Sequence, residues 1–104
     1  MAVIHLNGNN FDEEILKSEQ PALVDFWADW CMPCKMLGPV VEALGDELDG
    51  KVIVGKVNID ESSDLAAQYG VMSIPTLVLF KNGQEVDRMV GNRPKDEVEK
   101  FALQ

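Results

Sequence analysis

The 104-residue sequence has few of the side chains from which metal centres are built, since it holds two cysteines and a single histidine, His5. A structural zinc site needs about four nitrogen, sulfur or oxygen ligands, and His5 lies far from both cysteines in the sequence. The sequence also lacks any apolar run that approaches the ~20 residues of a membrane-spanning helix. These absences argue against a metal site and against a chain that crosses a membrane.

Basic residues are scarce as well. The chain has 9 lysines and arginines against 18 aspartates and glutamates, which gives a formal net charge of −9. This acidity argues against nucleic acid or an anionic membrane surface as a partner. Its simplest effect is solubility, and the alternative effect is the steering of partners that have basic surfaces.

A secretory leader is not evident, because residues 1–5 lack the charged start and the apolar core of a signal peptide. We therefore expect a cytoplasmic protein. The length suits one domain with one core, and a hydrophobic content of 46% supports a folded chain. No repeat or low-complexity segment divides the sequence, so we predict a single domain over residues 1–104. We also expect a monomer.

Both cysteines, Cys31 and Cys34, lie where a predicted buried strand (residues 22–28) passes into a predicted helix (residues 35–48). The free N–H groups and partial positive charge of a helix N-terminus favour a thiolate, so Cys31 is expected to be the attacking thiol. Cysteines at i and i+3 of a first turn share a face, with α-carbons near the roughly 5.5 Å of a disulfide. Pro33 suits this turn because it needs no N–H partner. In a cytoplasmic chain, this pattern favours redox chemistry.

Hydrophobic periodicity and turn signals predict the remaining elements. They are a strand at 3–6, a helix at 11–18 capped by Asn9 or Asn10, a strand at 51–59, a short helix to residue 69 capped by Ser62 or Ser63, strands at 76–81 and 85–90, and a helix at 94–103. Asn82-Gly83 is a strong hairpin signal, so the last two strands should be antiparallel. The sequence predicts an α/β fold with a mixed five-stranded sheet, in the order β-α-β-α-β and then α-β-β-α, with four helices on both faces.

The motif Trp-Ala-x-Trp-Cys-x-Pro-Cys-Lys at residues 27–35, preceded by Val-Asp-Phe, resembles the active-site motif of the thioredoxin family. Segments at 56–60, 74–76, 80–83 and 90–91 match in the family's order and spacing, so the resemblance covers nearly the whole chain. It implies the thioredoxin fold and the activity of a general protein disulfide reductase. One position departs, because Met32 stands where most members have glycine.

The resemblance implies a reaction by dithiol–disulfide exchange. Cys31 attacks the disulfide of a protein substrate, and Cys34 resolves the mixed disulfide. A thioredoxin reductase is then expected to restore the dithiol, and no cofactor is expected beyond the Cys31–Cys34 disulfide. Two alternatives stay open. One is a disulfide oxidant or isomerase, which Pro33 disfavours because such relatives commonly have histidine there, and the other is a redox-sensing binding module with the same fold.

Two charged residues lie in predicted buried strands. An ionised Asp25 between Val24 and Phe26 is costly unless it is paired, and burial should raise its pKa and make it a proton acceptor. The resemblance implies that Asp25 helps to deprotonate Cys34 and that Lys56 modulates the titration of Asp25. A partly hydrated structural aspartate and a lysine at the wet end of a strand are the ordinary alternatives.

The resemblance also implies a docking surface around the cysteines. Ile74-Pro75-Thr76 is similar to the family's cis-proline site, where the backbone of Ile74 would pair with an extended substrate. Trp30 is expected to shield the sulfur of Cys31 from water. The complete set of residues expected in this docking rim is Trp30, Met32, Pro33, Ser73, Ile74, Val90 and Gly91.

Overall fold

The centre of the protein is a mixed sheet of five strands, seen in a computed structural model that describes residues 2–104. Met1, which belongs to the predicted domain, lies outside the described residues. Parallel pairing joins β1 to β3 and β3 to β2, and antiparallel pairing adds β4 and β5, in the spatial order β1-β3-β2-β4-β5. The strands are β1 (Val3–Leu6), β2 (Ala22–Trp27), β3 (Ile53–Asn58), β4 (Thr76–Lys81) and β5 (Gln84–Val90). The predicted mixed sheet is therefore confirmed, with β2 at its centre.

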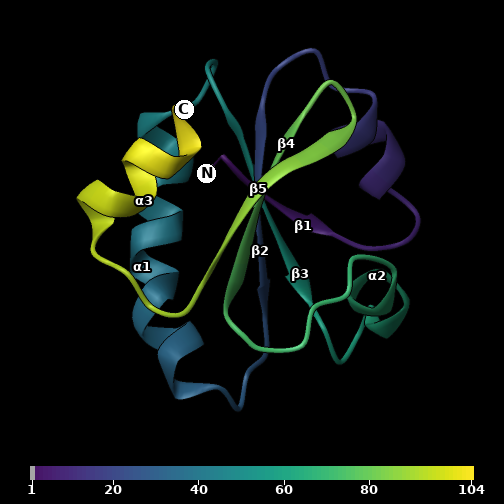
Figure 1. Cartoon of the computed structure of the whole chain (residues 1–104), viewed down its shortest axis with the longest axis vertical. Helices are drawn as coiled ribbons and strands as arrows, with labels where there is room; N and C mark the ends of the chain where they lie inside the picture. Colours follow the sequence, from purple (N-terminus) through teal and green to yellow (C-terminus); the bar gives the residue numbers. More distant parts are fainter. Residues whose placement is uncertain (1) are drawn as a thin grey trace.

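Helices cover both faces of this sheet, as predicted. α1 (Met32–Glu47) and α3 (Lys95–Ala102) lie on one face, and α2 (Ser63–Gln68) and a short π-helical segment, η1 (Asp12–Leu16), lie on the other (Figure 1). Within residues 2–104, no helix combines the length and apolar character needed to cross a membrane.

Each face of the sheet has its own apolar core, because side chains of a strand alternate between the two faces. Beneath α1 and α3 the core consists of Val3, Leu23, Leu37, Val41, Leu44, Leu48, Val52, Val54, Leu77, Leu79, Val98, Phe101 and Ala102. Beneath η1 and α2 it consists of Leu6, Phe11, Ile15, Ala22, Val24, Phe26, Val57, Leu65, Val78 and Phe80. The sheet and the helices are held together by these two cores.

The predicted helix at 11–18 is present but shorter, and most of it is π-helical. Phe11 and the five residues of η1 are helical, so the helix covers residues 11–16 and ends two residues before the predicted bound, where the N–H of Lys17 donates to the carbonyl of Asp12, at 2.9 Å. The side chain of Asn10 does not cap this segment, because its amide oxygen accepts from the N–H of Asn7 and its amide nitrogen donates to the carbonyl of His5. The helix prediction is therefore confirmed except for its last two residues, and the predicted cap by Asn10 is wrong because its side chain is used in the preceding turn.

Smaller differences concern where elements begin. α1 starts at Met32 rather than residue 35, because Cys31 takes the N-cap position. β3 starts at Ile53 rather than residue 51, because the N–H groups of residues 51 and 52 donate to the carbonyl of Leu48 at the end of α1. Ser62 takes the N-cap position of α2, as predicted, but its side chain makes no cap hydrogen bond.

The hairpin between β4 and β5 is confirmed in detail. Asn82 and Gly83 both have positive φ, at 54° and 77°, which is the conformation of a two-residue type I′ turn. A side chain at Gly83 would also approach the backbone, because an added Cβ would lie 2.8 Å from the carbonyl oxygen of Leu16. Glycine is therefore required at Gly83 both for its φ and for the approach of the η1 segment.

We predict that Gly83→Ala lowers the free energy of unfolding by about 2–4 kcal/mol, because left-handed backbone strain adds to the contact with Leu16. Gly50→Ala is the matched control, since Gly50 also has positive φ, at 87°, but an added Cβ there meets no atom within 4 Å. Its expected loss is about 1 kcal/mol, from backbone strain alone. Urea titration measures both, and equal losses would contradict the role of the Leu16 contact.

Candidate active site

The two cysteines lie at the edge of the sheet where the parallel strands end. β2 ends at Trp27, and α1 begins five residues later, at Met32. β1 and β3 run parallel to β2, and β4 runs antiparallel to it, so the carboxyl ends of β1 and β3 and the start of β4 lie at the same edge. Open α/β sheets commonly hold their functional sites at this edge.

Cys31 is the N-cap of α1. Its backbone is extended, with φ −96° and ψ 110°, and its sulfur accepts a hydrogen bond from the N–H of Cys34, at 3.2 Å. The sulfur thus stands in the place of the serine or aspartate oxygen that normally caps a helix. Pro33 is in the first turn, where the missing N–H removes no helical hydrogen bond. This geometry directs an N–H group and the positive end of the helix dipole at Cys31.

Cys31 and Cys34 form a disulfide, with their α-carbons 5.2 Å apart, as the spacing predicts. Both residues are buried, with exposed fractions of 5% and 3%. Ala28 completes a small buried cluster with them, against which Trp27, Ile59 and Ile74 pack. The disulfide is therefore buried just under the surface. Trp27 at the end of β2, Ile59 after β3 and Ile74 before β4 pack against it.

Asp25 lies in the central strand and is 1% exposed. Its two carboxylate oxygens have no hydrogen-bond partner among the described residues. Burial raises the pKa of Asp25 to about 7, and the charge of Lys56, its register partner in β3, opposes this rise. Asp25 shares a sheet face with Leu23, which packs under α1, and Cys34 belongs to the buried face of α1. The carboxyl group and Cys34 therefore point into the same layer, between β2 and α1.

Lys56 is partly exposed and lies against Trp27. Its Nζ atom is 4.4 Å from the centroid of the Trp27 ring, a cation–π distance. A hollow of about 260 Å³ opens beside this pair, lined by His5, Leu6, Trp27, Asp29, Lys56, Asn58 and Glu61. Lys56 thus meets solvent on one side and the aromatic ring on the other.

The structure brings together the segments predicted to form the docking rim. The carbonyl oxygen of Ile74 is 3.7 Å from the sulfur of Cys31, and the Ile74–Pro75 peptide bond is cis. The N–H of Gly91 donates to the carbonyl of Pro75, at 2.8 Å, which places the end of β5 beside the same segment.

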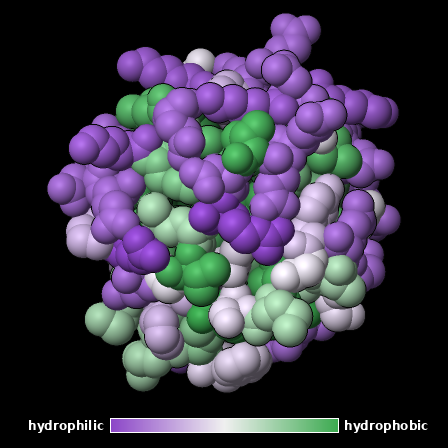
Figure 2. Space-filling view, in the orientation of Figure 1, coloured by the Kyte–Doolittle hydropathy of each residue, from purple (hydrophilic) through white to green (hydrophobic). Residues whose placement is uncertain are grey.

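Large apolar side chains around the disulfide are exposed. Trp30 is 68% exposed, Met32 65% and Val90 45%. Ser73 and Pro33 are exposed too, whereas Ile74 and Gly91 are half-buried and Pro75 is buried. Two further methionines, Met36 and Met72, are exposed at 61% and 93%. Figure 2 shows weakly hydrophilic and apolar residues gathered at the lower end of the molecule, where Figure 1 shows the start of α1 and the loop after α2.

Sequence reasoning missed one contact of Trp30. Its indole N–H donates to a carboxylate oxygen of Asp60, at 2.9 Å, and Asp60 follows the end of β3. Asp60 fixes the orientation of the ring next to Cys31. The available signal was the position of Asp60 just after a buried strand, whose carboxyl end had to lie beside that of β2.

The family model described as Thioredoxin matches residues 2–104 of the chain. The chain belongs to the thioredoxin family. Its redox group is a disulfide of the chain itself, and thioredoxins need no cofactor. Residues 2–104 contain no group of three or more His, Cys, Asp or Glu side chains placed to hold a metal ion.

Named bacterial thioredoxins are similar over most of their length. The thioredoxin of Chlorobaculum thiosulfatiphilum is 54% identical over 91 residues, which are 88% of this chain and 84% of the relative. The thioredoxin of Rickettsia bellii is 48% identical over 94 residues, which are 90% of each chain. The thioredoxin of Synechocystis is 55% identical over 86 residues, which are 83% of this chain and 80% of the relative. The chain is a disulfide oxidoreductase with the Cys-x-x-Cys pair of the family, consistent with dithiol–disulfide reductase activity.

We predict that Asp25→Asn stabilises this thioredoxin at high pH. Burial raises the pKa of Asp25 to about 7, against ~3.9 for a free aspartate. Between these values the folded protein holds a proton that the unfolded chain releases, so the contribution of Asp25 to the free energy of unfolding falls as pH rises and stays low above pH 7. Above about pH 8, the oxidised Asp25→Asn variant should be more stable than the wild type by roughly 2–4 kcal/mol, and below about pH 4 this advantage should vanish.

Urea titration of the oxidised proteins between pH 4 and pH 9 measures this difference. Asp49→Asn is the matched control, because Asp49 is exposed near the end of α1. The control variant should follow the pH dependence of the wild type. An Asp25→Asn advantage that does not grow with pH would contradict the assignment of a raised pKa to Asp25.

Proposed function

We propose that this thioredoxin is a general protein disulfide reductase in which Cys31 attacks and Cys34 resolves. The observation that carries this proposal is the hydrogen bond from the N–H of Cys34 to the sulfur of Cys31, at 3.2 Å, at the N-cap of α1. A sulfur that already accepts an N–H at a helix N-terminus is favoured as a thiolate, and the thiolate is the nucleophile of disulfide exchange.

The proposed reaction transfers two electrons in two exchanges. The Cys31 thiolate attacks one sulfur of the substrate disulfide, the other sulfur leaves as a thiolate, and a mixed disulfide forms. Cys34 then loses its proton and attacks the sulfur of Cys31, which releases the second substrate thiolate. The substrate gains two electrons, and the enzyme is left with the Cys31–Cys34 disulfide.

Asp25 is the proposed acceptor of the Cys34 proton. A carboxyl group with a pKa of about 7 is close to the pH at which the exchange must run, and its buried oxygens have no other partner among the described residues. Lys56 is the proposed modulator, since its charge lowers the pKa of Asp25. The two groups are neighbours across β2 and β3, which supports a coupled titration.

Substrate proteins are proposed to bind at the rim of exposed residues around the disulfide. An extended substrate segment would lie along the backbone of Ile74 and against the apolar side chains of Trp30, Met32 and Val90. Pro33, Ser73 and Gly91 complete this surface, and Pro75 shapes its floor. Trp30, oriented by Asp60, is proposed to limit the access of water to Cys31.

The proposal includes a cycle in cell redox homeostasis. A thioredoxin reductase returns the enzyme to the dithiol, so electrons flow from that reductase through Cys31 and Cys34 to substrate proteins. The proposed location is the cytoplasm, where thiols are kept reduced. Residues 1–104 are proposed to act as one thioredoxin domain and as a monomer, and the family match over residues 2–104 supports the single domain.

The order of attack is tested by trapping. We predict that Cys34→Ser accumulates a covalent adduct with a disulfide-containing protein, because the mixed disulfide on Cys31 cannot be resolved. Cys31→Ser should form no such adduct, and both variants should lose turnover at least about 10³-fold. Non-reducing electrophoresis followed by mass spectrometry identifies the linked cysteine.

Other outcomes of this experiment assign other functions. An adduct formed by Cys31→Ser would make Cys34 the nucleophile. A wild-type protein that binds partners only in one redox state, without turnover, would be a redox-sensing binding module. A wild-type protein that forms disulfides in glutathione buffers instead of reducing them would be an oxidant or isomerase.

Met32 is predicted to affect partner binding more than redox potential. Replacing a helical methionine by glycine changes helix stability by roughly 0.8 kcal/mol, which corresponds to a shift on the order of 15–20 mV if one redox state takes all of it. The lost apolar contact should raise the half-saturating concentration of a protein substrate about 3–10-fold. Met32→Ala separates the two effects, since it keeps the helix preference and removes the side chain. A Met32→Gly shift well above ~30 mV with unchanged protein kinetics would contradict this prediction.

A further inference from the structure

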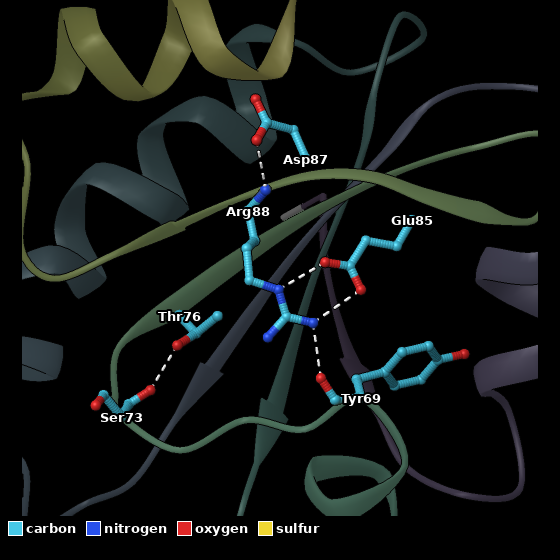
Figure 3. Close-up of polar contacts among 6 residues, drawn as sticks. All are labelled: Tyr69, Ser73, Thr76, Glu85, Asp87 and Arg88. Atoms are coloured by element: carbon cyan, nitrogen blue, oxygen red, sulfur yellow. Dashed lines mark hydrogen bonds and ion pairs between the residues drawn. The ribbon is translucent and has the colours of Figure 1, made fainter.

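Arg88 of β5 is tied to the end of α2 through its guanidinium group (Figure 3). Its Nε and Nη2 atoms donate to the two carboxylate oxygens of Glu85, at 2.6 and 2.8 Å, which is a bidentate pair. The same Nη2 atom donates to the backbone carbonyl of Tyr69, at 2.7 Å. An exposed ion pair alone would contribute little, so the contact with the carbonyl is the distinctive feature of Arg88.

Tyr69 follows the last residue of α2, so its carbonyl lies at the C-terminal end of the helix. Carbonyls at such an end lack helical partners and carry partial negative charge, which favours a cation. The ring of Tyr69 is held as well, with its centroid 5.3 Å from that of Phe80 and 5.4 Å from that of Phe11. The side chain of Tyr69 is therefore fixed by the core and its carbonyl by Arg88.

Residues 70–75 lead from this fixed point to the redox site. At the far end of the segment, the hydroxyl of Thr76 donates to the carbonyl of Ser73 (Figure 3), at 2.5 Å. Between the two fixed ends, the carbonyl oxygen of Ile74 lies 3.7 Å from the sulfur of Cys31. Side chains from β4 and β5 thus hold both ends of the segment that faces the disulfide.

We propose that Arg88 is a positioning residue for the docking of protein substrates. Held by Glu85, it fixes the carbonyl of Tyr69 and thereby sets where residues 70–75 lie against Cys31. The inference rests on the docking rim of the proposed function. Loss of the contact weakens the binding of an extended protein segment along Ile74, whereas a small disulfide that needs no such segment reacts as before.

The fork of the guanidinium explains why arginine suits this position. Arg88 presents several N–H groups in one plane, so it pairs with both oxygens of Glu85 and still donates to the carbonyl of Tyr69. A lysine supplies a single ammonium without this planar arrangement. Arg88→Lys should therefore restore only part of the function that Arg88→Met loses.

The test compares a protein substrate with a small one in single-turnover reactions. Each protein is reduced with dithiothreitol, freed of it, and mixed with increasing concentrations of insulin or of 5,5′-dithiobis(2-nitrobenzoic acid). Alkylation after an acid quench gives the fraction oxidised. For Arg88→Met, the half-saturating concentration of insulin should rise about 3–10-fold, with a limiting rate within about twofold of the wild type. The rate with the small disulfide should also stay within about twofold.

Lys95→Met is the matched control, because it also removes one positive charge from a partly exposed ion pair, between Lys95 and Glu47. Its kinetics should equal those of the wild type. Glu85→Gln, which frees the guanidinium but keeps Arg88, should raise the half-saturating concentration about 2–5-fold and serves if Arg88→Met does not fold.

An insulin half-saturation for Arg88→Met within twofold of the wild type would overturn the inference, as would an equal loss of rate with both substrates. The latter result would mean that Arg88 supports the fold or the sulfur chemistry rather than docking. A wild-type protein that reduces neither substrate would overturn the proposed function together with the inference. If the wild type reduces insulin with saturation, the proposed function stands, and an unchanged half-saturating concentration for Arg88→Met then counts against the inference alone.

Discussion

The hydrogen bond from the N–H of Cys34 to the sulfur of Cys31 is the interaction on which the redox site depends. It arises because the chain leaves the central strand at Trp27 and enters α1 within five residues, with Cys31 at the cap. The same turn that favours a thiolate at Cys31 places Cys34 one helical turn away, with α-carbons 5.2 Å apart. The proposed activation of Cys31 and the proposed use of Cys34 as the resolving thiol therefore rest on one local geometry. Neither requires a residue from a distant part of the chain.

Asp25 is governed by the opposite constraint. Whereas the helix end favours negative charge at Cys31, the middle of the sheet removes water from Asp25 and favours its neutral form, with a pKa raised to about 7. The two environments lie six residues apart along the chain, so the fold separates the proposed thiolate, Cys31, from the proposed proton acceptor, Asp25. Lys56 limits the rise, because its charge lies in the register position opposite Asp25. Burial of Asp25 therefore lowers the free energy of unfolding at neutral pH.

Much of the fold can be read from local patterns. The Asn82-Gly83 turn sets an antiparallel hairpin through its two positive φ angles, and the apolar strand before Cys31 becomes the central strand. The helix expected at 11–18 forms over residues 11–16, but the cap expected from Asn10 does not form, and sequence alone does not reveal that its side chain closes the preceding turn. In the site, the cysteines and Asp25 follow from the pattern of one strand and one helix. The contacts of Trp30 with Asp60 and of Arg88 with Tyr69 span 30 and 19 residues and leave no periodic signal.

The difference between the local contacts at the cysteines and the long-range contacts around them affects how the protein can vary. The disulfide is built from contiguous residues between the end of β2 and the start of α1, whereas the proposed docking rim joins Trp30, Met32 and Pro33 of that stretch to separate segments at residues 73–74 and 90–91. Contacts that hold these separate segments include the N–H of Gly91 on the carbonyl of Pro75, which joins the residue after β5 to the residue before β4. A substitution in β5 can therefore move residues 73–75 relative to Cys31 without changing the hydrogen bond from the N–H of Cys34 to the sulfur of Cys31. Partner preference is thus proposed to depend in part on β5, which can change while the residues around the disulfide are kept.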